Sequence, residues 1–255
     1  MKLTAASGVL LATDVKPAGA AADKSMPEGA VGFLYDATLC IGCKSCMFNC
    51  KRANSDAGGA LYSEEGRNVF EWNGPEQIWD APRDLSSKTL NIIKAYRSGS
   101  GENKDAENDG YSFVKRHCMH CVDPGCVSAC PVSAMEKDPR TGVVTYSADK
   151  CIGCRYCQVG CPFNIPKFEW ELAFPEIRKC QMCQHLQAFG GYPACCEFCP
   201  TGASLFGPVE SLRQEAEQRL NLKAGDSYEY PLHRVGSGKT VPAKAAAYNG
   251  GIYGK

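Results

Sequence analysis

The sequence predicts an α+β fold in which one small cysteine-rich unit is inserted within another, with a loop-rich insertion and a C-terminal helix and arm. Three observations lead to this prediction. Seventeen cysteines are concentrated in four tight runs, β-type segments introduce two of these runs in the same way, and turn-forming residues follow most of them. Because such self-similarity is the sequence signature of repeated structural units, we expect the runs to be structurally related.

The two central runs have the clearest spacing. They read Cys118-x-x-Cys121-x-x-x-x-Cys126-x-x-x-Cys130-Pro131 and Cys151-x-x-Cys154-x-x-Cys157-x-x-x-Cys161-Pro162. The second matches the bacterial ferredoxin signature for [4Fe–4S] clusters, in which the fourth cysteine ligates the neighbouring cluster, and the first has two additional residues before its third cysteine. We therefore expect one cluster on Cys118, Cys121, Cys126 and Cys161, and a second on Cys151, Cys154, Cys157 and Cys130.

The connection between these runs predicts a β-hairpin. Residues 138–142 read Asp-Pro-Arg-Thr-Gly, a turn composition, and residues 143–146 read Val-Val-Thr-Tyr, a β-rich segment. Pro131 and Pro162 disfavour a helical conformation at the cysteine before them. The hairpin should therefore bridge two cluster-binding loops.

The outer runs repeat the pattern less regularly. The first reads Cys40-x-x-Cys43-x-x-Cys46-x-x-x-Cys50, and the last comprises Cys180-x-x-Cys183 and Cys195-x-x-x-Cys199-Pro200. Tyr35 and Tyr146 each end a β-type segment five residues before a first cysteine, and Lys51 stands where a proline would follow. The two predicted ligand sets are Cys40, Cys43, Cys46 with Cys199, and Cys180, Cys183, Cys195 with Cys50. Cys196 is then the additional cysteine, although it is also an alternative to Cys195 as ligand.

Disulfides, structural zinc and haem attachment are the other common uses of closely spaced cysteines. A disulfide scaffold fits poorly, because the cysteine count is odd and the residues lie in four-member runs. Structural zinc is the main alternative, although it normally uses two C-x-x-C pairs separated by a longer loop. No C-x-x-C here is followed by histidine, which excludes c-type haem attachment.

The composition sets further limits. The chain has 28 basic and 28 acidic residues among 255, so no excess positive charge favours nucleic acid as a partner. Its aliphatic content is modest, and we expect inorganic clusters to supply cross-linking that a larger core would otherwise give. No stretch has the apolar length needed to span a bilayer, so we expect no direct membrane span in this sequence.

The segments outside the runs suggest further boundaries. Residues 1–23 contain a weakly apolar stretch followed by small residues, which we interpret as the remnant of a twin-arginine export signal; a short disordered tail is the alternative. Residues 51–110 form the loop-rich insertion, with a possible strand from Thr89 to Tyr96. In this insertion Phe70, Trp72 and Trp79 could dock a partner or simply pack against the core.

The remaining boundaries follow from the runs. We expect an outer unit made of residues 31–50 and 170–207, an inner unit of residues 111–169, and a helix from Pro208 to about Leu220 in the C-terminal segment 208–255. The helix should place Val209, Leu212, Ala216 and Leu220 along one side. From Lys223 onward we expect an extended arm.

With the four runs placed, the sequence resembles the four-cluster ferredoxin-like subunits of bacterial respiratory oxidoreductases. The resemblance covers about residues 31–220 and includes sixteen cysteines in order. Further residues are similar to the periplasmic iron–sulfur subunits of the hydrogenase-2 type. They are Leu34-Tyr35-Asp36, Asn91-Ile92-Ile93, the run from Ser98 to Asp105, and His117-Cys118-Met119-His120-Cys121-Val122-Asp123-Pro124. That family carries a twin-arginine signal and tends to carry a C-terminal hydrophobic anchor, so we expect either a truncated chain or attachment through partners.

The resemblance implies a non-catalytic electron relay. Electrons from the subunits of a [NiFe] hydrogenase would pass through four [4Fe–4S] clusters to an integral membrane quinone-reactive subunit, and the relay would be periplasmic and attached through its partners. One alternative is the same relay for a molybdenum or tungsten oxidoreductase acting on formate, polysulfide or thiosulfate, nitrate or a sulfoxide. Another is a free polyferredoxin.

Polar residues beside the cysteines suggest tuning rather than catalysis. Six basic residues adjoin the runs and could raise cluster potentials, dock a partner, or be ordinary solvated charges: Lys115, Arg116, Lys150, Arg155, Arg178 and Lys179. The histidines flanking Cys118, His117 and His120, fit hydrogen bonding near a cluster better than acid–base catalysis. No catalytic residue is predicted.

Overall fold

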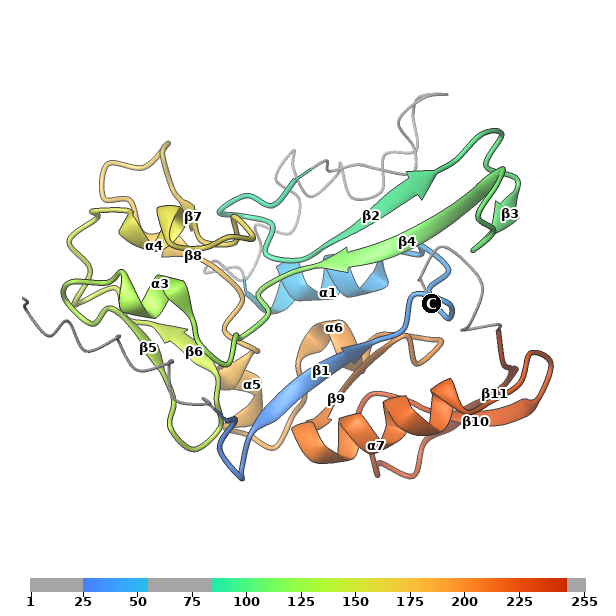
Figure 1. Cartoon of the computed structure of the whole chain (residues 1–255). Helices are drawn as coiled ribbons and strands as arrows, with labels where there is room; N and C mark the ends of the chain where they lie inside the picture. The colour runs from blue at the N-terminus through green and yellow to red at the C-terminus, as the bar shows by residue number, and fades with distance from the viewer. Residues whose placement is uncertain (1–24, 55–83, 247–255) are drawn as a thin grey trace, which may run out of the picture.

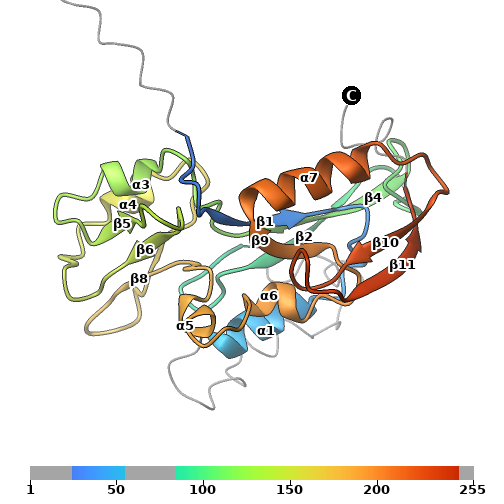
Figure 2. The same ribbon diagram turned by 90° about the horizontal axis from the view of Figure 1, so that it is seen from below.

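The computed structural model describes residues 25–54 and 84–246. These residues form two lobes, seen side by side in Figures 1 and 2. The small lobe (residues 118–178) contains α3, β5, β6, α4, β7 and β8, whereas the large lobe contains the elements from both ends of the described chain. The leader predicted at residues 1–23 and the aromatic residues of the insertion lie outside the described residues.

A two-stranded antiparallel sheet brings the two ends of the large lobe together. β1 (Val31–Tyr35) pairs with β9 (Ser204–Pro208), with Val31 opposite Pro208. Figure 2 shows helix α7 (Val209–Leu220) on one side of these strands, and α1 (Ser45–Ala53) and α6 (Ala194–Glu197) on the other. Gly32 permits the close approach of α7, because a Cβ there would lie 3.3 Å from Val209 Cγ2. The sheet thus joins the first cysteine run to the last.

A three-stranded sheet forms from the end of the predicted insertion. β2 (Ile92–Arg97) pairs antiparallel with β4 (Gly110–Arg116), and the short β3 (Asn103–Lys104) pairs parallel with β4. The strand expected from Thr89 is confirmed as β2, although it begins at Ile92. Ile92 and Ile93 of this strand are buried in the core with Cys46 and Met47, so this part of the insertion packs into the large lobe. Two adjacent isoleucines are a local strand signal within an otherwise polar segment.

The small lobe contains the predicted hairpin. β5 (Met135–Lys137) pairs antiparallel with β6 (Val144–Tyr146), and the Asp138 carboxylate accepts hydrogen bonds from the Arg140 and Thr141 amides in the turn. A second hairpin joins β7 (Lys167–Phe168) to β8 (Ile177–Arg178). Three short helices complete the described cysteine-bearing region: α3 (Gly125–Ser128), α4 (Tyr156–Val159) and α5 (Gln184–Gln187).

The C-terminal segment contains a helix and a hairpin. Helix α7 begins after Pro208 and ends at Leu220, as predicted. The expected extended arm is wrong for the described part, because β10 (Ser227–Pro231) and β11 (Thr240–Lys244) pair antiparallel. Tyr230, which is fully buried, anchors this hairpin. Glycine and lysine dominate the composition here and mask a short strand signal in Tyr228-Glu229-Tyr230.

The buried side of α7 also differs from the predicted one. Leu212 is buried, but Leu220 is 54% exposed, and Glu215 and Arg219 occupy the interior instead. The Arg219 guanidinium bonds Glu215 at 2.8 Å and Asp36 at 3.0 Å. At the C-terminal end of α7, a buried polar network therefore lies where apolar side chains were expected. Across the two described ranges, no helix combines the length and apolar character that a membrane crossing requires.

Candidate iron–sulfur sites

The C-x-x-C loop that begins each of the four cysteine runs has the same backbone feature. The residue just before the second cysteine has a positive φ in every run: 69° at Gly42, 46° at His120, 70° at Gly153 and 56° at Met182. Glycine adopts this left-handed conformation without steric cost, whereas histidine and methionine must be held in it by their surroundings. The predicted repeat is therefore visible in the backbone, including runs without glycine at this position.

Helices position the third cysteine of each run. Cys46 lies on α1, Cys126 on α3, Cys157 on α4 and Cys195 on α6. Three of these helices have four residues, whereas α1 continues through Cys50 to Ala53. Lys51 explains the difference, because it permits helical backbone after Cys50 where proline would disfavour it.

Charge interactions between thiols link cysteines within each of the four predicted ligand sets. We name these predicted sets site A (Cys40, Cys43, Cys46 and Cys199), site B (Cys50, Cys180, Cys183 and Cys195), site C (Cys118, Cys121, Cys126 and Cys161) and site D (Cys130, Cys151, Cys154 and Cys157). That each set binds one cluster stays a prediction.

The proximity within each set appears in the thiol ionisation. Burial raises the pKa of Cys50 well above its usual range, and the thiols of Cys195, Cys180 and Cys183 raise it further. At site D, burial and then the neighbouring thiols raise the pKa of Cys157 to about 11. Four thiols that disfavour each other's ionisation form a suitable environment for a positively charged metal core, which would reverse that penalty.

Charge interactions between thiols connect the four sites in one row, in the order A, B, C, D. Thiol charges interact across three junctions: Cys46 with Cys195 between A and B, Cys180 with Cys118 between B and C, and Cys126 with Cys157 between C and D. Sites A and B are in the large lobe, and site D is in the small lobe. The row therefore runs from one lobe into the other.

Backbone amides point at several sulfur atoms. The Ala134 and Met135 amides donate to Cys130 Sγ at 3.2 and 3.5 Å, and the Ser204 amide, the counterpart of Met135, donates to Cys199 Sγ at 3.3 Å. In the C-x-x-C loops, the Gly153 and Met182 amides each lie 3.4 Å from the first cysteine sulfur. Amide donors of this kind stabilise thiolates and, in iron–sulfur proteins, tune the cluster potential.

The two tyrosines that mark the repeat lie near the first cysteine of their runs. The Tyr35 hydroxyl donates to the Phe113 carbonyl at 2.9 Å and lowers the pKa of Cys40, against the larger effect of burial. The Tyr146 hydroxyl accepts from the Ile177 amide at 3.3 Å and interacts with the Cys151 thiol. Their identical distance from the first cysteine in each sequence was the signal that pointed to this role. The outermost sites, A and D, thus each receive a phenolic partner.

Across the described residues, no group of three or more histidine, cysteine or acidic side chains converges on a point that would hold one metal ion.

His120 supplies one indication that a cluster fits the site. Its Nδ1 accepts a hydrogen bond from the Val144 amide at 3.0 Å, so the proton is on Nε2. That Nε2 is buried and has no hydrogen-bond partner in the described structure. Buried donors are nearly always satisfied, and the sulfur atoms of a cluster at the adjoining site C would provide an acceptor. The side chains present therefore fit a [4Fe–4S] group.

The histidines are not arranged for proton transfer. Burial and then Lys115 lower the pKa of His117 to about 3, while its Nδ1–H donates to the Cys118 carbonyl at 2.7 Å. Burial, Lys179 and His117 likewise lower the pKa of His120 well below its usual range. Both imidazoles are therefore neutral hydrogen-bonding groups at ordinary pH.

Cys196 neighbours both Cys195 and Cys199. It is fully buried, and its sulfur lies 4.0 Å from Cys195 Sγ. The hydrogen bond from Cys196, together with Lys115, lowers the pKa of Cys195 to about 6 despite burial. Cys195, rather than Cys196, is among the thiols that act on Cys50. This observation favours Cys195 as the ligand.

The six basic residues fall into two groups. Arg116, Lys150 and Arg178 pair with carboxylates: Arg116 with Asp84 at 2.8 Å, Lys150 with Glu136 at 2.7 Å, and Arg178 with Glu169 at 3.7 Å. Arg155 lies over the Trp170 ring at 4.6 Å. Lys115 and Lys179 instead extend their ammonium groups into the interior.

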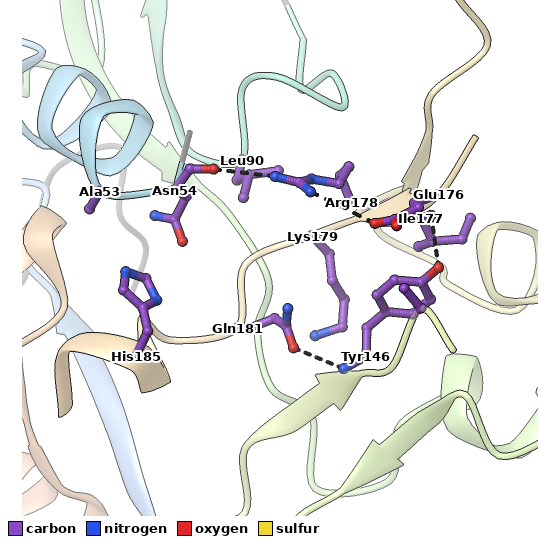
Figure 3. A pocket seen from close by; sticks show the side chains of 11 residues that line it. Ala53, Asn54, Leu90, Tyr146, Glu176, Ile177, Arg178, Lys179, Gln181 and His185 are labelled. Carbon is purple, nitrogen blue, oxygen red and sulfur yellow. Dashed lines mark hydrogen bonds and ion pairs between the residues drawn. The ribbon is translucent and has the colours of Figure 1, made fainter. Parts of the chain in front are cut away.

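A cavity of about 380 Å³ lies between the lobes and is shown in Figure 3. Its polar side chains bond one another: Gln181 accepts from the Tyr146 amide at 2.9 Å, and the Tyr146 hydroxyl accepts from the Ile177 amide at 3.3 Å. No nucleophile paired with a base lines the described part of this cavity. The cavity gives no reason to expect substrate chemistry.

Comparison with known proteins adds a family context. The family described as 4Fe-4S dicluster domain matches residues 110–209. The chain is 42% identical over 259 residues to "Hydrogenase-2 operon protein HybA" of Escherichia coli O157:H7, covering 98% of this chain and 74% of that protein. It is 34% identical over 231 residues to "Formate dehydrogenase iron-sulfur subunit" of Haemophilus influenzae, covering 90% of this chain and 65% of that protein.

Proposed function

Because this chain belongs to the family of HybA-like iron–sulfur electron-transfer subunits, we propose that it relays electrons between a [NiFe] hydrogenase and an integral membrane subunit that reacts with quinone. The subunit is non-catalytic: its task is to hold redox groups in sequence. Four [4Fe–4S] clusters, one each at sites A to D, would carry the electrons.

The observation that carries this proposal is the continuous row of four cysteine sites. Each junction has thiols from neighbouring sites close enough for their charges to interact. A bound cluster supplies one-electron transfer at each position, with a potential set by hydrogen bonds, burial and nearby charge. This chain's residues contribute sulfur ligands, amide donors and two tyrosine hydroxyls. A row, rather than a compact group, is the arrangement that moves electrons between two partners.

The ends of the row reach the surface, which supports exchange with partners there. At site A, Cys43 is exposed and Ile41 is 59% exposed. On the small lobe, which carries site D, several large apolar side chains are exposed. They are Ile152, Tyr156, Val159, Phe163, Trp170, Leu172 and Phe174. Clusters of exposed apolar side chains commonly mark protein interfaces.

The division into units is part of the same proposal. Sites A and B with β1 and β9 would form the outer ferredoxin-like unit, and sites C and D with β5 and β6 the inner one. The shared positive φ before each second cysteine supports this division. A periplasmic location, reached by a twin-arginine signal, also belongs to the proposal; it rests on the composition of residues 1–23.

A molybdenum or tungsten enzyme is the second candidate class of partner. Relatives named as formate dehydrogenase iron–sulfur subunits are 34% and 36% identical to this chain. The same relay could therefore serve a molybdenum or tungsten enzyme. A free polyferredoxin is a third possibility, which the exposed apolar residues of the small lobe disfavour.

Metal analysis of the native complex distinguishes these proposals. The chain, tagged at its C-terminus, would be extracted gently from membranes without oxygen and analysed with whatever co-purifies. Nickel together with about sixteen irons per chain, beyond those of the partner, is the expected result for four four-iron clusters. Molybdenum or tungsten without nickel would identify the second partner class, and iron alone a free carrier. Zinc in place of iron would contradict every version of the relay.

A further inference from the structure

The hairpin of β5 and β6 leaves one edge of β6 unpaired by another strand, and side chains from other segments satisfy that edge. The Val144 amide donates to His120 Nδ1 at 3.0 Å, and the Val144 carbonyl accepts from Lys179 Nζ. Further along β6, the Tyr146 amide donates to Gln181 Oε1 at 2.9 Å (Figure 3). Because β5 holds β6 on its other side, these contacts fix the position of the His120 imidazole.

The same imidazole has one polar atom left without a partner in the described part of the chain. Since Nδ1 accepts a hydrogen bond, the ring proton is on Nε2. His120 is only 4% exposed, and its Nε2 has neither water nor a protein acceptor within reach. An unsatisfied buried donor costs free energy, and native structures seldom retain one without a reason. The polypeptide therefore presents a donor whose acceptor must come from outside it.

The backbone of His120 carries a further energetic cost. Its φ is 46°, a left-handed conformation that glycine adopts freely and histidine does not. The same loop position is glycine in two other runs, Gly42 and Gly153, and in the last run Met182 places an apolar side chain in the core. Among the four runs, only His120 brings a polar side chain to this position. A histidine at a position where glycine would cost less indicates that the imidazole itself has a function.

The position of His120 in the chain points to site C as the source of the acceptor. The residue lies within the loop from Cys118 to Cys121, which supplies the first two thiols of that site. The Lys179 charge acts both on the imidazole and on the Cys126 thiol, so the third site C cysteine and the ring lie near the same ammonium. The sulfur atoms of a [4Fe–4S] cluster accept hydrogen bonds.

We propose that His120 donates its Nε2–H to a sulfur atom of the cluster at site C and that this hydrogen bond raises the reduction potential of that cluster. The inference rests on the proposed relay function. Reduction adds one negative charge to a cluster, and a donor aimed at its sulfur stabilises the added charge. The edge of β6 holds the donor in place in both redox states, so electron transfer through site C requires little rearrangement.

Two substitutions separate the two hydrogen bonds of the imidazole. His120→Asn keeps an acceptor for the Val144 amide and tolerates left-handed backbone, but its side chain is too short to reach the cluster. His120→Gln places an N–H about as far from Cα as Nε2, but it has no acceptor at the position of Nδ1. His120→Asn should therefore lower the site C potential, whereas His120→Gln should keep most of it. A purely structural role for His120 predicts the opposite order.

Redox titration of the anaerobically purified complex, followed by electron paramagnetic resonance, measures the potential, and Cys126→Ser identifies the site C signal. For His120→Asn the expected drop is about tenfold in the ratio of reduced to oxidised cluster at fixed solution potential, or about 59 mV for one electron. His185→Asn is the matched control, because His185 also lies close to a cluster cysteine but is exposed. It should leave the site C potential unchanged. An unchanged site C potential in His120→Asn with full iron content would overturn the proposal.

A spectroscopic measurement observes the hydrogen bond directly. In the complex labelled with ¹⁵N at histidine, pulsed electron paramagnetic resonance should detect a ¹⁵N coupling on the site C signal. This coupling should persist in His117→Asn, which alters the other histidine beside Cys118, and disappear in His120→Asn. Absence of the coupling, or its appearance on the signal of another cluster, would contradict the proposal.

The same measurement covers the case in which His120→Asn loses iron. The labelled complex with His120 intact then decides, because a site C coupling that persists in His117→Asn supports the proposal and a missing one overturns it. Failure of the relay function itself appears earlier, as an iron count well below four clusters before any histidine is changed.

Discussion

The two lobes differ in how much apolar core surrounds their cysteines. The large lobe contributes Met47, Ile92, Ile93, Phe113 and Phe206 to a continuous apolar core that also takes in Val143 and Ile165 of the small lobe. The separate small-lobe cluster has only three fully buried apolar residues besides cysteine, which are Met135, Val144 and Ile177. Apolar burial is the main favourable term in folding. We therefore expect side-chain packing to stabilise most of the large lobe, and bound clusters to contribute more to the stability of the small lobe.

Removing iron should therefore destabilise the small lobe much more than the large lobe. In chelator-treated protein we expect amide protection in β5 and β6 to fall to nearly that of an unfolded chain, while β2 and β4 keep most of theirs. Hydrogen exchange followed by mass spectrometry measures both in one sample. Equal loss in the two lobes would show that the large lobe also depends on its clusters.

Single ligand replacements should show the same asymmetry on a smaller scale. Cys157→Ser removes a site D ligand from the small lobe, and Cys46→Ser removes a site A ligand from the large lobe. Each should cost up to about four irons per chain. Only Cys157→Ser should also make the small lobe sensitive to limited proteolysis, because little apolar core remains there. Iron analysis of both variants gives the control for equivalent cluster loss.

The interior ion network offers a test confined to the large lobe. Arg219→Ala leaves Asp36 and Glu215 buried without their cation, and should lower the free energy of unfolding of the large lobe by about 3–5 kcal/mol. Denaturant unfolding of the iron-loaded protein measures it. Arg213→Ala, whose partner Glu217 is exposed, is the matched control and should change that free energy by less than about 0.5 kcal/mol. A small effect of Arg219→Ala would mean that water reaches the network.

The smallest effects should come from equivalent turns after the fourth cysteines. Gly202 in the large lobe has φ 72°, and its counterpart Ser133 in the small lobe has φ 50°. Ser133→Gly should stabilise the small lobe by up to about 1 kcal/mol by removing left-handed strain. Gly202→Ala should destabilise by about 1–3 kcal/mol, since a Cβ there would lie 2.6 Å from the Pro231 carbonyl oxygen. Thermal unfolding of the iron-loaded variants, measured in parallel, checks both signs.

Much of this arrangement could be predicted because the repeats are local. The hairpin between the central runs, β1 and the start of α7 at Pro208 all follow from spacing and turn composition. The four ligand sets rest on the same spacing and stay predictions. Cysteine spacing is informative because a cluster requires ligands at fixed separations. The identity of each set, in particular the placing of Cys199 with the first run, followed from the ferredoxin pattern of exchanged fourth cysteines.

The remainder depended on tertiary contacts that no short window contains. The interior position of Arg219 reflects a partner, Asp36, from the opposite end of the chain, so helical periodicity favoured Leu220 instead. The hairpin of β10 and β11 is fixed by the burial of Tyr230 against the large lobe. Lys115 and Lys179 have the same sequence context as Arg116, Lys150, Arg155 and Arg178, and only their tertiary contacts separate them: the other four pair with carboxylates or lie over an aromatic ring.

The pairing of β1 with β9 also affects the order in which the lobes can fold during synthesis. During synthesis β1 leaves the ribosome early, but its partner strand appears only after Cys199. Contacts between distant segments form more slowly than local ones, and domains tend to fold as their last residues emerge. The small lobe, complete by residue 178, can therefore assemble while Cys40, Cys43, Cys46 and Cys50 still wait for their partners. The earliest-made thiols are the last to be enclosed, and in the living cell they are the ones that most need protection from oxidation.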